Sequence, residues 1–254
     1  MTTSMTATVT RRVVPKDRMR RYLAALLARP GATARTAYVA PWSAPPPLAE
    51  LSPSFAGAEG LDRVTSAIEA SDVGVALFWD GRLLRAVLPP LPLAVEMETE
   101  GIDATPLLAL LDTEPVIAAC LVRLGRYGIG VYQGERLLAS KTDRRFVKGR
   151  HKKGGSSSNR FRRIREGQMH ELYKDVCETL QDRLGPYERD IEHFFLGGEA
   201  HTLAGFRDWC PWAERFGSVA RKRLLDVREP GHDALVALPK TLWESVVYEM
   251  APPL

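Results

Sequence analysis

Residues 114–149, EPVIAACLVRLGRYGIGVYQGERLLASKTDRRFVKG, decide the fold of the second half of the chain. They contain three strand-like runs, which are separated by turn signals at Gly125 and at Gln133-Gly134. Short apolar runs with glycine-containing turns between them are typical of antiparallel strands. The stretch therefore predicts a three-stranded antiparallel meander.

A long helix is predicted after the meander, over residues 158–184. Gly185-Pro186 follows it and is a helix stop signal. Its apolar face recurs at helical spacing. The residues of this face are Phe161, Ile164, Met169, Leu172, Val176 and Leu180.

Beyond this helix the pattern alternates between strands and helices. Strands are predicted at 193–196 and 223–227, and helices at 203–216 and 233–250. Alternation of this kind indicates parallel strand pairs in an α/β layer. The second half is therefore predicted as an α/β domain with a mixed sheet, a meander first and β-α-β units afterwards.

The first half has fewer clear patterns. Residues 17–29 have the spacing of an amphipathic helix and precede a Pro30-Gly31 stop. Residues 74–92 are two apolar runs joined at Asp80-Gly81, as in a hairpin. These elements predict a smaller α+β module.

The composition is that of a globular chain with room for two modest domains, with 254 residues, 45% hydrophobic and 26% charged. We expect a disordered tail over residues 1–12, an accessory α+β module over 13–105 and the α/β domain over 106–254. No apolar run has the length of a membrane span, and the N-terminus has no apolar signal core. We therefore expect a cytoplasmic protein without a membrane partner.

Three cysteines, Cys120, Cys177 and Cys210, stand far apart in the sequence. Their odd number and spacing match neither a disulfide framework nor a metal-ligand set, and they suit a reducing cytosol. We expect each to be a small buried apolar residue. We expect no metal and no cofactor.

Positive charge is concentrated in one segment. The net charge is only +4, but residues 144–165 contain ten Lys or Arg and no Asp or Glu, which leaves 25 basic and 31 acidic residues elsewhere. A block of like charges repels itself unless an anion neutralises it, and a phosphate backbone is the usual anion. The segment therefore predicts a polyanionic partner.

The arginines of this segment occupy an unfavourable place in the predicted helix. Arg160, Arg162, Arg163 and Arg165 fall in its first two turns, where the helix dipole already places positive charge. Gly154-Gly155 lacks Cβ atoms and allows close approach of the backbone, and Ser156 to Asn159 supply capping side chains. Together these features predict an anion site, long enough for a nucleic-acid backbone. The alternatives are a solvated basic helix face and RNA binding without chemistry.

The segment KKGGSSSNRFRRIRE, residues 152–166, resembles a known family. The middle domain of archaeal and eukaryotic class-1 peptide release factors has a basic run, then Gly-Gly-Gln, an Arg-Phe pair and an arginine-rich helix. FFLGGEAHTLAGF at 194–206 and RKRLLDVREPGHDAL at 221–235 are similar to the elements that follow it. The resemblance covers about half of the chain. The sequence resembles still more closely a related group, the release-factor-like ribosome-rescue peptidyl-tRNA hydrolases of the Vms/ANKZF type and their bacterial relatives.

The resemblance implies a ribonuclease-H-like domain and a codon-independent peptidyl-tRNA hydrolase that acts in translation quality control. Its partners would be the large ribosomal subunit, ribosomal RNA and peptidyl-tRNA, with no DNA. A water molecule would attack the ester of peptidyl-tRNA, and backbone N–H groups would stabilise the oxyanion. The implied catalytic residues are Gly154, Gly155, Ser156, Ser157, Ser158 and Asn159. The implied RNA-binding residues are Arg150, His151, Lys152, Lys153, Arg160, Arg162, Arg163 and Arg165.

The loop departs from the family pattern at one position. Ser156 stands where the family has glutamine, and Asn159 is the amide nearest to it. Two alternatives therefore stay open. One is a factor that binds the ribosome without hydrolysis. The other is a nuclease on the same scaffold, for which Asp112, Glu114 and Glu135 are the candidate carboxylates.

Overall fold

The computed structural model describes residues 8–28, 31, 33–41, 55, 60–147 and 158–251. The chain forms two compact units, each with its own β-sheet. The first unit comprises Met1–Thr113 and Lys240–Leu254, and the second comprises Glu114–Pro239. The predicted boundary at residue 105 is therefore wrong by one helix, α4 (Thr105–Asp112), which belongs to the first unit.

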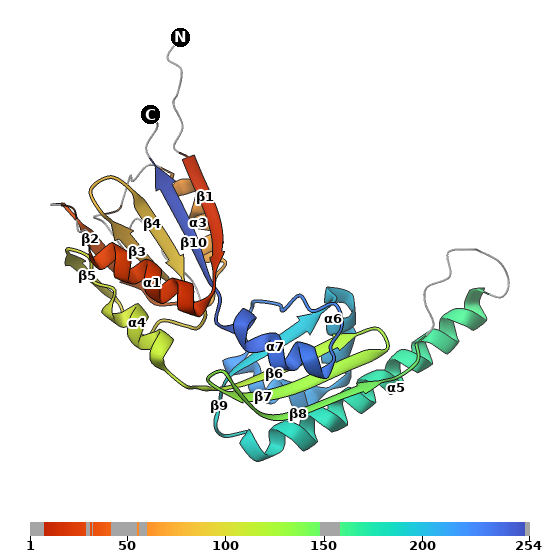
Figure 1. Ribbon diagram of the computed structural model, residues 1–254. Coiled ribbons are helices and arrows are strands. Elements are labelled where there is room, and N and C mark those ends of the chain that lie inside the picture. The colour runs from red at the N-terminus through yellow and green to blue at the C-terminus, as the bar shows by residue number, and fades with distance from the viewer. Residues whose placement is uncertain are drawn as a thin grey trace, which may run out of the picture. The chain divides into compact units, whose positions relative to one another are not determined.

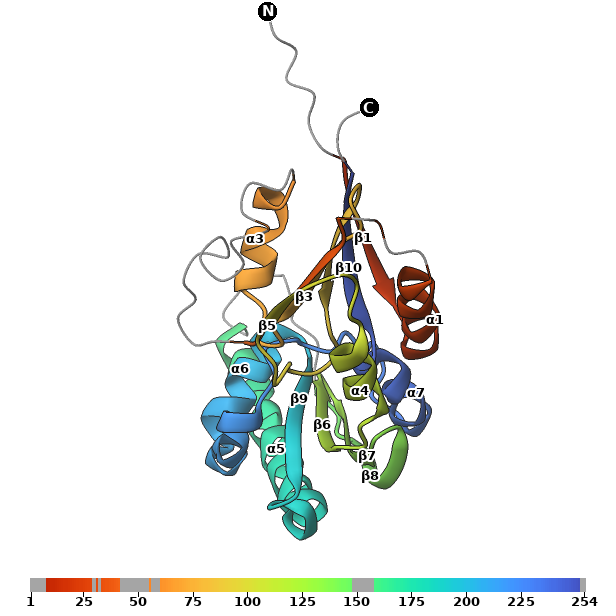
Figure 2. The same ribbon diagram turned by 90° about the vertical axis from the view of Figure 1, so that its left-hand side faces the viewer.

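The first unit is built on a six-stranded sheet in the order β1-β10-β4-β3-β2-β5, and every neighbouring pair is antiparallel. Its elements are β1 (Thr8–Val14), α1 (Lys16–Leu27), β2 (Arg35–Val39), α3 (Asp62–Glu69), β3 (Val75–Trp79), β4 (Leu84–Leu88), β5 (Met97–Glu100), α4 and β10 (Ser245–Ala251). Helices α1 and α3 lie on opposite faces of the sheet (Figure 2). Because both faces are covered, residues 75–78 of β3 are buried without alternation.

The two ends of the chain meet in this sheet, which the sequence pattern did not predict. Strand β1 pairs with β10 over residues 8–14, so the expected tail is wrong for residues 8–12, while residues 1–7 lie outside the described part of the chain. The helix predicted at 233–250 is also wrong beyond residue 242. There the β-branched run at Val246-Val247 favours a strand, and β10 joins the first unit rather than the second.

The second unit has the mixed sheet that the sequence predicts (Figure 1). Strands β6 (Val116–Arg123), β7 (Arg126–Gln133) and β8 (Arg136–Arg144) form the meander. Helix α5 (Ser158–Leu184) then leads through a short 3-10 turn, η2 (Gly185–Tyr187), to β9 (Ile191–Gly198), which pairs parallel with β6. The α/β class and the mixed sheet are therefore confirmed.

The helices of the second unit cover both faces of its sheet. Helix α5, α6 (Ala200–Trp209) and the 3-10 segment η3 (Pro211–Val219) share one apolar core with β6, β7 and β9. On the opposite face, the Tyr132 hydroxyl donates a hydrogen bond of 2.9 Å to the carbonyl of Leu235 in α7 (His232–Leu242). Pro211 ends α6 at Trp209, so the helix predicted over 203–216 is two elements.

Two further sequence expectations fail in this unit. The strand predicted at 223–227 is reduced to one isolated parallel bridge, between Gly197 and Leu225, and a second bridge, between Phe194 and Ala220, lies just before it. Cys177 and Cys210 form a disulfide at a sequence separation of 33, contrary to the expectation that no pair would form. Cys120 is buried as expected.

Candidate nucleic-acid interface

The carboxy-terminal part of α5 is fixed in the core of the second unit. Met169, Leu172, Val176, Leu180 and Leu184 are buried there at three- and four-residue spacing, which places them on one helix face. The disulfide from Cys177 to Cys210 adds a covalent link to the residue that follows α6. These contacts determine the direction in which the other end of the helix points.

The amino-terminal turns of α5 extend beyond the strands of the sheet (Figure 1). Phe161 and Ile164 were predicted on the buried face, but their side chains are 40% and 37% exposed. The prediction is wrong for these two residues because the apolar face continues past the end of the core. Helix α5 has 27 residues, a length of about 40 Å, so its first turns form an arm outside the domain.

This arm carries the predicted basic residues on its surface. Asn159, Arg160, Arg162 and Arg163 are all exposed. Arg162 lies 3.9 Å from Glu166, and both side chains are more than half exposed, so the pair contributes little. No carboxylate in the described part of the chain pairs with Arg160 or Arg163. Two guanidinium groups are therefore available to an external anion.

Arg145, from the same basic run, behaves differently. It follows β8 and donates hydrogen bonds to Asp175 at 2.8 Å and to Glu171 at 3.1 Å, both on α5. Its charge is neutralised within the protein, and it fastens the helix to the end of the sheet. Arg145 is therefore a structural cation of the run and not a candidate for binding an external anion.

Arg165 is intermediate between these two cases. It is half-buried, and its Nε atom is buried with no hydrogen-bond partner among the described residues. The pKa of the nearby Tyr173 hydroxyl is raised by burial, and Arg165 acts in the opposite direction. Arg165 therefore lies against the domain, whereas Arg160, Arg162 and Arg163 face solvent.

Electrostatics make the start of α5 a site for anions. Its first turn contains no acidic residue, and the helix dipole adds partial positive charge at this end. An exposed cation here costs helix stability by about 0.3–1 kcal/mol. The cluster is therefore unfavourable for its own helix, and within the described residues only Arg162 has a carboxylate partner, the exposed Glu166.

The remaining predicted site residues lie outside the described part of the chain. Ser158 is the first residue of α5. The residues of the site for which no placement is described are Arg150, His151, Lys152, Lys153, Gly154, Gly155, Ser156 and Ser157. The structure therefore describes the helix that follows the loop and leaves the loop itself as a prediction.

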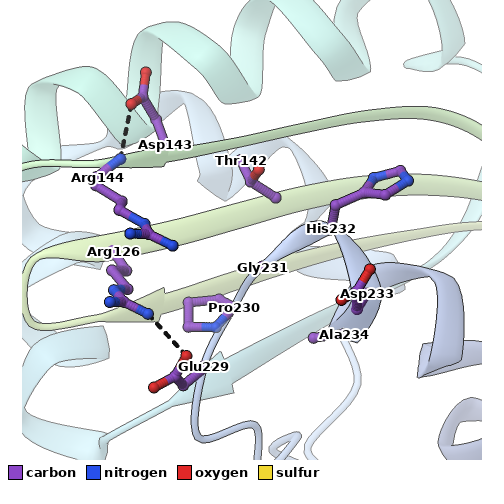
Figure 3. Close-up of a pocket in the computed structure, with 10 residues that line it drawn as sticks. All are labelled: Arg126, Thr142, Asp143, Arg144, Glu229, Pro230, Gly231, His232, Asp233 and Ala234. Atoms are coloured by element: carbon purple, nitrogen blue, oxygen red, sulfur yellow. Dashed lines mark hydrogen bonds and ion pairs between the residues drawn. The ribbon is translucent and has the colours of Figure 1, made fainter.

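The second unit also contains a pocket that the sequence pattern did not predict. It has a volume of about 560 Å³ and lies between the β7–β8 pair and the segment that leads into α7 (Figure 3). Arg126 and Arg144 line it together with the carboxylates of Asp143, Glu229 and Asp233, and Arg126 lies 2.8 Å from Glu229. Positive and negative groups offset each other here, so the pocket does not match a polyanion.

Neither the free thiol nor the candidate carboxylates of the described residues form a second reactive site. Burial raises the pKa of Cys120, so the one free thiol is kept protonated.

The three candidate carboxylates of a nuclease are divided between the two units. Asp112 pairs with Arg20 in the first unit, whereas Glu114 and Glu135 belong to the second. Within the described ranges there is no group of three His, Cys, Asp or Glu that could hold a metal, and no helix is long and apolar enough to cross a membrane.

The chain is similar in part to curated peptide chain release factors. Peptide chain release factor subunit 1 of Archaeoglobus fulgidus is 32% identical over 104 residues, which is 41% of this chain and 25% of that protein. The protein of the same name from Thermococcus sibiricus is 27% identical over 146 residues, which is 56% of this chain and 34% of that protein. The chain thus spans between a quarter and about a third of the length of these relatives.

Solved structures of translation factors give weaker matches. The archaeal translation termination factor aRF1 has 17% identity and a TM-score of 0.40, over 91% of this chain and 73% of that one. Archaeoglobus fulgidus Pelota has 11% identity and a TM-score of 0.31, over 93% of this chain and 62% of that one. Scores of this size do not establish a common fold, so the class depends on the sequence matches.

The matching sequences define a release-factor-like class, and a family model makes the assignment more specific. The model described as Actinobacteria/chloroflexi VLRF1 release factor matches residues 115–248, just over half of the chain. The chain belongs to this release factor family. The match begins at β6 and ends in β10, so most of the first unit, including β1 and α1, lies outside it.

Proposed function

We propose that the protein is a ribosome-associated, codon-independent peptidyl-tRNA hydrolase that releases nascent peptides from stalled large subunits. This places it with the ribosome-rescue hydrolases of the Vms/ANKZF type and their bacterial relatives, in the cytoplasm. The observation that carries the proposal is the exposed arginine cluster at the start of α5, which directly follows the Gly-Gly-Ser-Ser-Ser-Asn loop.

The arm supports binding to ribosomal RNA. Arg160 and Arg163 have no carboxylate partner among the described residues, and Arg162 has only an exposed one. Their charges add to the positive end of the helix dipole, and an RNA backbone supplies phosphates at a spacing that an extended cluster can contact. In the proposal, the basic residues of the loop, Lys152 and Lys153, extend the same contact.

The loop would carry the chemistry. Water attacks the carbonyl carbon of the peptidyl-tRNA ester, a tetrahedral oxyanion forms, and the bond to the ribose oxygen breaks as that oxygen gains a proton. Backbone N–H groups at Gly154 and Gly155 would stabilise the oxyanion, since no Cβ keeps the backbone away from the substrate. The polar side chains from Ser156 to Asn159 would orient the water.

The missing glutamine favours a second candidate, a factor that occupies the ribosome without hydrolysis. No Gln occurs between Gln133 and Gln168, and Gln168 lies ten positions into α5, about 15 Å from its start. Gln168 therefore cannot replace a glutamine at Ser156. Asn159 is exposed in the first turn and is the amide that the hydrolase proposal uses.

Peptide release from large subunits that carry labelled peptidyl-tRNA tests the proposal. The native protein is expected to release peptide, and the double variant Gly154→Ala, Gly155→Ala is expected to lose release while it still sediments with the subunits. The matched control is Gly217→Ala, Gly231→Ala, because a Cβ at either position meets no other atom within 4 Å.

Three other outcomes would change the conclusion. Sedimentation of the native protein without release would favour the non-catalytic factor. Shortened tRNA in place of intact tRNA would favour a nuclease. Release that survives in the Gly154→Ala, Gly155→Ala variant would move the chemistry away from this loop.

A further inference from the structure

A crevice in the first unit is lined by cations and lies outside the family match. It runs between strand β1, at the edge of the sheet, and helix α1, and has a volume of about 430 Å³. Its lining residues are Arg12, Val13, Val14, Arg18, Arg21 and Tyr22. Three of the six are arginines and none is acidic, so the crevice favours an anionic ligand.

One side of the crevice is held rigid by hydrogen bonds. Glu249 of β10 accepts a bond of 2.6 Å from Arg12 and a bond of 2.9 Å from the Tyr22 hydroxyl. Burial, together with Glu249, raises the pKa of the Tyr22 hydroxyl, so it stays a neutral donor. The Arg12 guanidinium lies 5.9 Å from the centre of the Tyr22 ring. Glu249 offsets the charge of Arg12 and fixes its position.

The other side carries two arginines that the fold does not use. Arg18 and Arg21 are exposed and three positions apart on α1, so they lie on the same face of the helix. Arg21 reaches only the carbonyl of Asp17, at 3.4 Å, and neither arginine pairs with a carboxylate within the described ranges. Two like charges at this spacing repel each other unless an anion lies between them.

Arg20, on the same helix, differs from Arg18 and Arg21 because its guanidinium group is used in contacts within the protein. It forms an ion pair with Asp112 and donates a hydrogen bond of 2.9 Å to the carbonyl of Leu111, and these contacts tie α1 to α4. Met19 and Leu23 bury the helix against the sheet. Packing and pairing therefore account for positions 19, 20 and 23, but not for Arg18 and Arg21.

We propose that this crevice binds a single-stranded segment of RNA through its phosphate backbone. Arg18 and Arg21 contact phosphates, and the apolar wall that includes Val13, which is 46% exposed, and Tyr22 contacts ribose or base. A single small anion would leave this apolar wall unused, whereas a single-stranded nucleotide segment presents both phosphates and flat rings to the crevice. The first unit then contributes an RNA contact of its own, separate from α5.

Binding of the full-length protein to a fluorescent single-stranded RNA of roughly a dozen nucleotides tests this inference. The variant Arg18→Glu, Arg21→Glu is expected to lower affinity about tenfold or more and to reduce the slope of log affinity against log salt by roughly 1 to 2. The matched control is Arg35→Glu, Arg82→Glu, two exposed arginines elsewhere in the same unit, and it is expected to bind like the native protein.

Further variants and a competitor distinguish this crevice from the amino-terminal turns of α5 and distinguish RNA from other ligands. The same loss is expected when Arg18→Glu, Arg21→Glu is added to a protein that already carries Arg160→Glu, Arg162→Glu, Arg163→Glu. Arg18→Lys, Arg21→Lys is expected to retain most of the affinity. Unchanged RNA binding in Arg18→Glu, Arg21→Glu would overturn the inference, as would displacement of the RNA by polyglutamate at equal charge concentration, since that points to an acidic protein.

Discussion

The two ends of α5 belong to one continuous helix but differ in burial, in covalent linkage to the rest of the domain and in charge. The carboxy-terminal end buries Leu172, Val176 and Leu180 and is linked to Cys210 by a disulfide. The amino-terminal end leaves Phe161 and Ile164 about 40% exposed and places arginines where the helix dipole disfavours them. The carboxy-terminal end of the helix is therefore part of the core, and the amino-terminal end is the part that we propose contacts RNA.

This contrast shows that one helix can be anchored in a domain core at one end and leave its other end exposed to solvent. Because the carboxy-terminal end of α5 is packed in the core, the exposed amino-terminal end keeps its position as part of the same continuous helix. Substitutions along α5 should therefore divide sharply into those that change the free energy of unfolding and those that change binding.

The largest effect on stability is expected from the buried end. Leu172→Ala should lower the free energy of unfolding by about 3 to 5 kcal/mol, because a fully buried leucine is lost and a cavity remains. Ile164→Ala, at the exposed end, should cost less than about 1 kcal/mol. Urea denaturation of the two variants measures both values, and similar losses would show that the whole helix is packed.

The disulfide should contribute the next largest effect. Reduction, or the double variant Cys177→Ser, Cys210→Ser, should lower the free energy of unfolding by about 3 to 4 kcal/mol, because the link constrains a loop of 33 residues in the unfolded chain. Thermal unfolding with and without dithiothreitol measures this. The double variant should not respond to the reductant, and a native protein that does not respond either would lack the bond.

The Arg145 contacts should contribute a smaller amount. Arg145→Gln should lower the free energy of unfolding by about 1 kcal/mol, because its partners Asp175 and Glu171 are partly exposed to solvent and the pairs are screened. The loss should shrink at high salt. Chemical denaturation at two salt concentrations checks this, and a loss that is independent of salt would indicate packing rather than charge.

The smallest effect on stability has the opposite sign. Arg160→Glu should raise the free energy of unfolding by about 0.5 kcal/mol, because an acidic residue suits the positive end of a helix. The same change should weaken RNA binding. Arg183→Glu is the control at the other end of α5, where the dipole favours a cation, and it should be destabilising. A loss of stability in Arg160→Glu would mean that Arg160 has a structural role.

The meander and α5 could be predicted because their signals are local. Glycine turns at Gly125 and Gly134 separate the three strands, and both glycines have positive φ angles. Helix α5 begins and ends at the predicted residues, 158 and 184. The basic character of its first turns could also be predicted, because the arginines from Arg160 to Arg165 follow directly after the predicted start of the helix.

The rest depended on contacts between distant residues. Strand β1 is a strand because β10 lies beside it, more than 230 positions later in the sequence, and neither segment shows its pairing locally. Cys177 and Cys210 are brought together by the packing of α5 against α6. The exposure of Phe161 and Ile164 depends on where the sheet ends, which helical periodicity does not encode.

Contact between the amino-terminal end of α5 and a phosphate backbone is tested by the salt dependence of binding to purified large ribosomal subunits. The native protein is compared with Arg160→Glu, Arg162→Glu, Arg163→Glu and with the charge-matched control Arg189→Glu, Arg207→Glu, Arg228→Glu, three exposed arginines elsewhere in the second unit. We expect weaker binding and a slope of log affinity against log salt that is reduced by roughly 2 to 3 for the α5 variant alone. An unchanged slope in that variant, or an equal reduction in the control, would show that this end of α5 does not contact the phosphate backbone.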